Sequence, residues 1–428
     1  MRTETEKTKP QRAFFKCIRF AERERRAFDK LGRDQVKVFL DRFSQRRIHQ
    51  NGNFKMKKSL TAVAILGAFA GASFAADVTL YGVVDYGMLY QAQEIKNLPF
   101  DGYSTKFVDD RASKLGLDSG INAGSRFGIK GSEDLGNGLT LSFKLENGFN
   151  ADDGTMGQDN RLFGREASMT LSGNFGKLSA GRIGALGSAA GSYDTVFAIG
   201  DAFDGGDNAI FGMVTTSRLD NAIVYQSPKV AGLQATMQYS FKNDNKVEAG
   251  REGHKDAARY AGFALTGEYG NLQTVAAYEQ RLLADRQDEK IVSVGANYDL
   301  GVTKLFAMGQ YFENLFGETR FEQFDNREIT DPFRWKDVDG TAFHIGAVTP
   351  LFGGELTTGA YYLEADEHEP GKLNYLGAAA RYTYALSQRT SVYTGVGYGE
   401  WEIDNEGAIA KNQTLKTTQA YVGLTHAF

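Results

Sequence analysis

The stretch Leu139-Thr-Leu-Ser-Phe-Lys-Leu-Glu146 alternates apolar and polar side chains with a period of two. In a β-strand, residues two apart share a face, so this stretch would present one apolar face and one polar face. A soluble β-sandwich and a membrane-spanning barrel both produce this pattern. The number of strands and the spacing of the turns between them therefore decide the fold.

Seven tight turn signals divide residues 76–428 into strand-like runs. They lie at 134–138, 174–176, 228–232, 269–271, 299–301, 350–354 and 385–389. Longer polar connections are expected at 91–122, 185–219, 242–258, 314–338 and 403–415. Seven hairpins give fourteen strands, and the first and last runs bring the total to sixteen. Because an even number of antiparallel strands closes a barrel, the sequence predicts an all-β, 16-stranded antiparallel transmembrane β-barrel.

The composition excludes several other classes of protein. The chain has 428 residues, of which 42% are hydrophobic, and this fraction is too high for a disordered chain. Its mean hydropathy of −0.38 is too polar for a bundle of membrane-spanning helices. Cys17 is the only cysteine, so a disulfide scaffold and thiol chemistry are excluded.

Residues 56–75 read MKKSLTAVAILGAFAGASFA, which is two lysines, a short apolar run and a small-residue site. This is the pattern of a cleaved secretory signal peptide, and we expect cleavage to leave a barrel of residues 76–428. The upstream residues 1–55 carry 16 Lys and Arg against 7 Asp and Glu. We interpret this basic extension as an over-extended start or a removed leader, absent from the mature protein, rather than as a nucleic-acid-binding segment.

If the apolar face of the strands meets lipid, the polar face lines the interior of the barrel. A cylinder of sixteen strands is too wide for side chains to fill, so we expect water inside it and a passive channel. The connection 185–219 is rich in Gly and is the only one long enough to fold inward and return. We predict that it narrows the channel, the alternative being an ordinary surface loop. Its aspartates lack the spacing of a calcium-binding loop, so we expect no metal ion.

The alternation also assigns charged residues to the interior. Arg126 and Lys130 alternate with apolar residues that would face lipid, and the same reasoning places Lys144 and Glu146 inside. Arg218 has the parity of the polar residues in its own strand. We predict that these side chains face the lumen, the alternative for each arginine being a solvated position at the rim of the barrel.

Five longer motifs lie along residues 77–428. They are Val78-Thr-Leu-Tyr-Gly-Val-Val-Asp85, Gly124-Ser-Arg-Phe-Gly-Ile-Lys-Gly-Ser-Glu-Asp-Leu-Gly-Asn-Gly-Leu139, Leu171-Ser-Gly-Asn-Phe-Gly-Lys-Leu-Ser-Ala-Gly-Arg182, Arg218-Leu-Asp-Asn-Ala-Ile-Val-Tyr-Gln-Ser-Pro228 and Gly423-Leu-Thr-His-Ala-Phe428. With these motifs the chain resembles the trimeric general-diffusion porins of Gram-negative outer membranes, particularly the betaproteobacterial type. The resemblance implies a homotrimer of sixteen-stranded barrels in the cell outer membrane, with the third long loop folded into each channel.

The resemblance also implies which residues form the constriction. The constriction arginines of the family match Arg126, Arg165 and Arg218, while Arg182 matches an arginine of the barrel wall. The acids that would face them across the channel belong to the inward loop. They are Asp194, Asp201 and Asp204.

The alternation does not place Arg165 clearly in the lumen, because Arg165 shares its strand face with residues that would face lipid. Either the neighbouring Glu166 is the group that faces the lumen, or the inward loop covers an apolar inner face at this point. In the family, Gln or a small residue often follows this arginine, so Glu166 leaves the sign of the selectivity open. An arginine-rich narrowing favours anions, and this is the direction that we expect.

The final strand ends in Phe428, which resembles the family's signal for the outer-membrane β-barrel assembly machinery. We predict a porin for small hydrophilic solutes and ions, in contact with outer-membrane lipid, without a cofactor or a nucleic-acid partner. Two alternatives stay open, namely a substrate-selective channel and a barrel plugged for a structural or adhesive role. We do not expect an enzyme, because the sequence has no Gly-x-Ser-x-Gly motif and few histidines.

Overall fold

The computed structural model describes residues 77–99, 107–246, 248–319, 333–367, 371–405 and 412–428. The upstream extension expected at 1–55 and the signal peptide expected at 56–75 lie outside these residues. No helix in the described ranges is long and apolar enough to cross a membrane.

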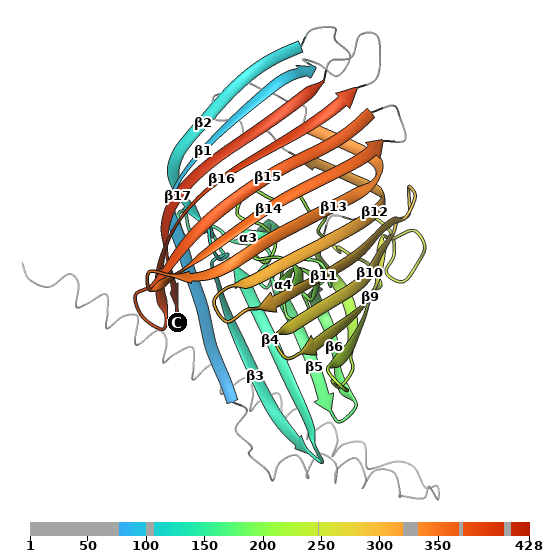
Figure 1. Ribbon diagram of the computed structural model, residues 1–428. Helices are drawn as coiled ribbons and strands as arrows, with labels where there is room; N and C mark the ends of the chain where they lie inside the picture. The colour runs from blue at the N-terminus through green and yellow to red at the C-terminus, as the bar shows by residue number, and fades with distance from the viewer. Residues whose placement is uncertain (1–76, 100–106, 247, 320–332, 368–370, 406–411) are drawn as a thin grey trace, which may run out of the picture. The chain divides into compact units, whose positions relative to one another are not determined.

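Seventeen strand segments and two short helices follow one another along the described chain (Figure 1). They are β1 (Asp77–Pro99), β2 (Phe107–Ser119), β3 (Arg126–Gly136), β4 (Leu139–Gly148), α3 (Gly157–Asn160), β5 (Glu166–Gly173), β6 (Gly176–Gly184), α4 (Val196–Gly200), β7 (Arg218–Gln226), β8 (Leu233–Ser240), β9 (Arg259–Tyr269), β10 (Leu272–Leu282), β11 (Glu289–Asp299), β12 (Lys304–Thr319), β13 (Phe333–Leu351), β14 (Gly354–Glu367), β15 (Gly371–Ala385), β16 (Thr390–Asn405) and β17 (Gln413–Ala427).

Antiparallel pairing closes these strands into a barrel, because β17 pairs with β1. Two segments, β2 and β3, pair antiparallel with successive parts of β1. They are therefore two parts of one strand, which is interrupted at residues 120–125. The seventeen segments make sixteen antiparallel strands, and the predicted all-β barrel is confirmed.

All seven short turns lie where the sequence predicts them. The first joins β3 to β4 through Asn137 and Gly138, whose φ angles of 53° and 76° are left-handed. An Asn-Gly pair adopts this backbone easily, because glycine has no Cβ atom and asparagine tolerates the left-handed region. Tight hairpins at one end of the barrel thus fix the register of the alternating strands.

Three long connections are shorter than the sequence predicts. The predicted connections at 91–122, 314–338 and 403–415 were wrong, because the strand ladders continue into all three segments. On β1 and β2, for example, Arg111 pairs with Glu94 at 2.9 Å. Charged cross-strand pairs replace the apolar face there, so the hydrophobic period ends before the strand does.

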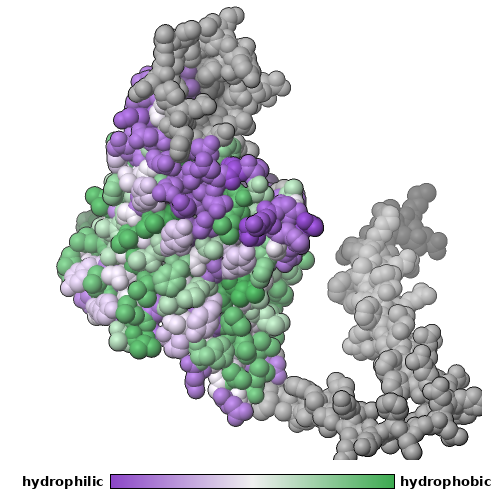
Figure 2. Space-filling model, turned by 90° about the vertical axis from the view of Figure 1, so that its right-hand side faces the viewer, coloured by the Kyte–Doolittle hydropathy of each residue, from purple (hydrophilic) through white to green (hydrophobic). Residues whose placement is uncertain are grey.

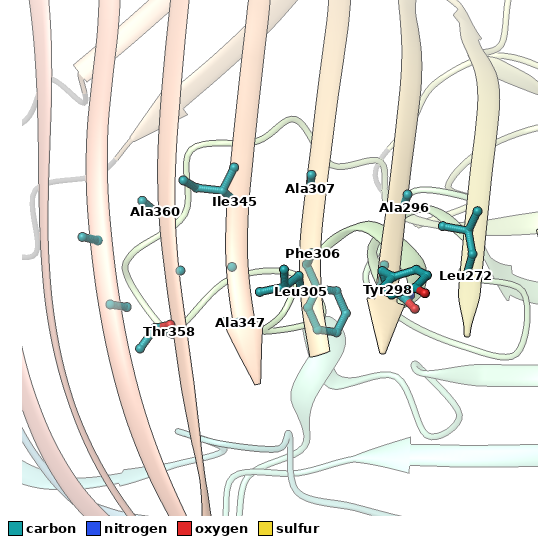
Figure 3. A pocket seen from close by; sticks show the side chains of 15 residues that line it. Leu272, Ala296, Tyr298, Leu305, Phe306, Ala307, Ile345, Ala347, Thr358 and Ala360 are labelled. Carbon is teal, nitrogen blue, oxygen red and sulfur yellow. The ribbon is translucent and has the colours of Figure 1, made fainter. Parts of the chain in front are cut away.

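The outer face of the barrel is apolar. Alternate side chains are exposed there, including Leu80 and Ile345, which are 64% and 66% exposed. Figure 2 shows hydrophobic side chains over the middle of one face of the barrel and hydrophilic ones toward one end. A groove of about 750 Å³ crosses this outer face over β10–β15, lined mostly by apolar side chains such as Ala307 and Leu305 (Figure 3). A band of this kind is typical of contact with lipid.

The inner face has two different halves. On β9–β15 it is largely apolar, with side chains such as Val275, Met308 and Tyr361 buried. The third long loop, residues 185–217, packs its own apolar side chains against this half, including Phe197 of α4. The predicted inward-folded third long loop is therefore confirmed. The inner face of β3–β6 is largely polar and charged, and a hollow of about 400 Å³ lies between it and the loop.

Candidate pore constriction

Four arginines lie at the same end of neighbouring strands on the polar half of the inner wall. Arg126 begins β3, Arg182 lies near the end of β6, and Arg218 begins β7. Arg165 directly precedes the first residue of β5. The charges of Arg126 and Arg218 both interact with that of Arg165, and Arg218 also interacts with Arg182. The structure thus brings together all four arginines that the family motifs indicate.

Carboxylates of the wall neutralise two of these arginines. Arg165 Nε donates to Glu146 Oε1 at 2.7 Å, and Arg182 Nη1 donates to Asp220 Oδ1 at 2.7 Å. Asp220 also accepts a hydrogen bond from Arg161 Nη1 at 2.8 Å. Sequence reasoning missed Arg161, because it lies in the second long loop, residues 149–165 between β4 and β5, where strand alternation gives no signal.

Arg126 and Arg218 have no carboxylate partner in the described part of the chain. Arg126 Nη1 donates to the carbonyl oxygen of Gly124 at 3.1 Å. Arg218 Nε is buried and has no hydrogen-bond partner among the described residues. Both residues remain partly accessible to solvent. These two arginines therefore form no ion pair with a described residue, although the charge of Glu146 acts on both of them.

Glu166 faces the lumen, and Arg165 reaches the same space because it precedes the ladder of β5. Glu166 is 1% exposed. It accepts hydrogen bonds from Lys144 Nζ at 2.9 Å and from Ser192 Oγ at 2.8 Å. Since Ser192 belongs to the inward loop, this acid connects the loop to the polar wall.

Lys130 and Glu146 lie on the same inner face, on either side of Tyr81. The Tyr81 hydroxyl donates to Glu146 Oε2 at 2.8 Å, and Lys130 Nζ lies 5.2 Å from the centre of the Tyr81 ring. Gly128 provides the space for this ring, because a Cβ atom there would lie 2.6 Å from it. The alternation of β3 and β4 thus places the charges in the lumen.

Asp201 of the inward loop anchors the loop to the wall opposite the arginines. It is 2% exposed, and its Oδ1 accepts a hydrogen bond from the Tyr361 hydroxyl at 3.0 Å. Its Oδ2 accepts from the backbone N–H groups of Gly205 and Gly206 at 3.0 Å each. The expectation that Asp201 faces the arginines is corrected, because backbone amides of the loop and the wall residues Tyr361 and His344 satisfy its carboxylate.

The other acids of the loop are also engaged. Asp194 and Asp204 share a hydrogen bond; burial raises the pKa of Asp194 to about 8 and also raises the pKa of Asp204. Asp207 accepts from the hydroxyl of Tyr421 at 2.7 Å and from Gln419 at 3.2 Å. Among the described residues, no group of three or more His, Cys, Asp or Glu side chains is placed to bind a metal ion.

A closed barrel with an apolar outer face, a charged lumen and a loop folded inside defines the class of outer-membrane channel proteins. A family model described as Gram-negative porin matches residues 61–404. The chain therefore belongs to the Gram-negative porin family, as its motifs imply, and is a protein of the outer membrane.

Individual relatives agree with this assignment. An outer membrane porin protein of Bordetella pertussis is 31% identical over 407 residues, covering 87% of this chain and 100% of the relative. Outer membrane porin protein 32 of Delftia acidovorans is 30% identical with the same coverage. Among solved structures, an anion-selective porin from Comamonas acidovorans matches with a TM-score of 0.54 and 25% identity, covering 82% of this chain and 100% of that one.

Proposed function

We propose that this porin is a passive diffusion channel for small hydrophilic solutes and ions, and that its constriction favours anions. The four arginines would form one side of the constriction, and the inward loop would form the other. The observation that carries the proposal is the pair Arg126 and Arg218, neither of which forms an ion pair with a carboxylate of the described chain. Positive charge without an ion-pair partner beside a narrow aqueous path attracts anions and repels cations.

The state of the loop acids supports the same direction. Asp201 and Asp207 are satisfied by groups of the loop and of the opposite wall, and Asp194 and Asp204 share a hydrogen bond. Within the described residues, none of these four acids forms an ion pair with an arginine of the cluster. The solved relative from Comamonas acidovorans, described as anion-selective, supports the same sign. Residues 76–428 carry 31 Lys and Arg against 46 Asp and Glu, and this excess of negative charge acts mainly at the mouths of the channel. Salt screens charges beyond about 8 to 10 Å.

The proposal includes assembly as a homotrimer surrounded by outer-membrane lipid. Within the described residues, β2 pairs with another strand along one edge only. Its outward side chains Leu115 and Leu117 are 66% and 62% exposed. A strand edge with exposed apolar side chains gains stability when another copy of the chain covers it.

Reversal potentials in a salt gradient across a planar bilayer test the selectivity. We expect ohmic steps and anion selectivity for the native protein. In the double variant Arg126→Gln/Arg218→Gln, the anion-to-cation permeability ratio should fall about thirtyfold, because the two unit charges together contribute about 2 kcal/mol at contact distance in water.

Arg251→Gln is the matched control for the double variant, because Arg251 is exposed and pairs with Asp256 outside the lumen. It should leave the reversal potential unchanged. An unchanged potential in the double variant would remove both arginines from the selective site. An absence of conductance steps in the native protein would instead support the plugged, structural barrel.

A further inference from the structure

The hollow between the polar wall and the inward loop is lined by hydroxyl and ammonium groups. It lies nearer to the short turns than the arginine cluster does, and its volume is about 400 Å³. Short turns lie on the periplasmic side of outer-membrane barrels, so the hollow is between the arginines and the periplasmic mouth. Its polar lining residues are Thr79, Lys130, Ser132, Ser142, Lys144, Glu166, Ser168, Thr170, Ser172, Lys177, Ser192 and Tyr193.

Strand register arranges these groups in rows across the wall. Lys130 of β3 lies directly opposite Lys144 of β4. The next row toward the short turns contains hydroxyl groups, since Ser132 pairs with Ser142 and Ser142 pairs with Thr170. Two ammonium groups therefore lie next to a row of hydroxyl groups, on the side away from the short turns.

The pairing of Lys130 with Lys144 is unfavourable for the barrel alone. Like charges directly opposite each other on neighbouring strands destabilise a sheet. Lys144 is relieved by its ion pair with Glu166, but Lys130 makes no ion pair with any described residue. Lys177, on the other side of the hydroxyl row, likewise has no carboxylate partner in the described ranges. Lys130 and Lys177 are both exposed, and they present positive charge to the hollow.

The hydroxyl groups facing the hollow are also available. Thr79, Ser132 and Ser142 make no side-chain hydrogen bond with a described residue. The one acid of the lining, Glu166, is occupied, because it accepts from Lys144, Ser168 and Ser192. Free donors thus converge on the hollow, while its carboxylate is shielded from a cation.

From this geometry we propose that the hollow is a saturable binding site for small oxyanions that carry two negative charges, with inorganic phosphate as the type. This site rests on the proposed anion channel. It would be a second position at which anions bind, on the periplasmic side of the arginines. Lys130 and Lys177 supply charge from two sides, and the hydroxyl row donates hydrogen bonds to the oxygen atoms. Lysine and hydroxyl donors together suit a group with several acceptor oxygens.

Titration of phosphate into chloride across a planar bilayer tests the site. In the native protein, chloride conductance should fall with phosphate concentration and reach a plateau. In Lys130→Gln/Lys177→Gln, the half-saturating phosphate concentration should rise about tenfold, because charge-assisted hydrogen bonds are lost. The double variant Ser132→Ala/Ser142→Ala should also raise the half-saturating phosphate concentration, although it leaves the charge of the wall unaltered.

Lys304→Gln is the matched control for the lysine variant. Lys304 faces the lumen from β12 on the other half of the barrel, with Nζ 5.1 Å from the centre of the Phe306 ring. Removing its charge should leave the half-saturating concentration unchanged. A linear response of the native protein to phosphate, or an equal effect of Lys304→Gln, would overturn the site.

The reversal potential in potassium chloride separates this proposal from the proposed function. Anion selectivity without saturation by phosphate means that the site is wrong and the arginine constriction stands. Saturation by phosphate in a channel without anion selectivity supports the phosphate site. It contradicts the proposal that the arginine constriction favours anions. Each variant must still give conductance steps in chloride alone, which shows that its barrel has folded.

Discussion

Asp194 shows how its surroundings change the role of an acidic residue, through its contact with Asp204. They belong to the same inward loop and share a hydrogen bond. Because burial raises the pKa of Asp194 to about 8, its carboxyl group remains protonated at neutral pH and can donate. The pair therefore holds two segments of the loop together and does not act as a pair of free charges.

We predict that this contact weakens as pH rises. The folded-state pKa of Asp194 lies above the unfolded value of about 3.9, so its stabilisation is complete below pH of about 4 and is lost as pH rises through about 8. Asp194→Asn keeps a donor at every pH. Above pH 8, chymotrypsin should therefore cleave the native loop, at residues such as Tyr193 and Phe197, faster than the loop of the variant.

The ratio of the two cleavage rates at each pH cancels the pH dependence of the protease itself. Asp153→Asn changes an exposed acid of the second long loop and should follow the native protein at every pH. Parallel pH profiles for the native protein and Asp194→Asn would show that this carboxyl group does not control the loop.

At the level of elements, one side chain of the wall fastens both ends of the inward loop. Glu279 of β10 is 2% exposed. Its Oε1 accepts from the N–H of Gly187 at 3.1 Å, near the start of the loop, and from the Thr216 hydroxyl at 2.9 Å, near its end. The Tyr260 hydroxyl donates to the same atom at 2.7 Å. A single acceptor thus holds the two stems of the loop against the wall.

We predict that Glu279→Ala loosens the loop by about 3 kcal/mol, because buried donors lose a charged acceptor. In bilayer recordings, the variant should close at lower voltage and fluctuate more than the native channel. Glu279→Gln keeps an oxygen that can accept from the same donors, so its effect should be much smaller. Glu268→Ala, which removes an exposed acid from β9, should behave like the native protein. Equal behaviour of Glu279→Ala and Glu279→Gln would contradict this role.

The elements themselves were largely predictable, because hydrophobic alternation and turn residues are local signals. The Asn137-Gly138 turn is an example. Contacts between distant segments were not predictable in this way. Asp201 meets Tyr361, 160 residues away, and nothing near Asp201 in the sequence indicates that contact. The sequence does indicate that Glu279 is unusual, since it is a lone carboxylate on the same inward face of its strand as Val275. Only the fold shows which groups it binds.

At the level of the whole molecule, closure of the barrel brings the end of the chain onto its first strand. β1 and β17 pair from Val83 with Ala427 to Lys96 with Thr414. Beyond this ladder, Phe428 and Gly82 exchange two backbone hydrogen bonds of 3.0 and 3.1 Å. The Phe428 ring packs over Gly82, where a Cβ atom would lie 2.3 Å from it.

The Phe428 ring is 46% exposed, so it is accessible to a partner, while the backbone bonds that close the barrel do not require it. We predict that Phe428→Ala refolds in lipid vesicles as well as the native protein does. Its amount in the outer membrane of cells should fall about tenfold, if the ring contributes about 1.4 kcal/mol to recognition by the assembly machinery. A folded barrel migrates differently on a denaturing gel before and after heating. This difference measures both the refolded fraction in vesicles and the amount of folded protein in the outer membrane.

Phe352→Ala is the control that separates recognition from general hydrophobicity. Phe352 lies in the short turn between β13 and β14 and is 87% exposed, so it presents a phenylalanine ring without a terminal strand. This variant should reach the outer membrane at the native level. If both variants are depleted equally, exposed apolar surface and not the terminal residue drives assembly. If Phe428→Ala also fails to refold in vesicles, the ring acts in closing the barrel, because no assembly machinery is present there.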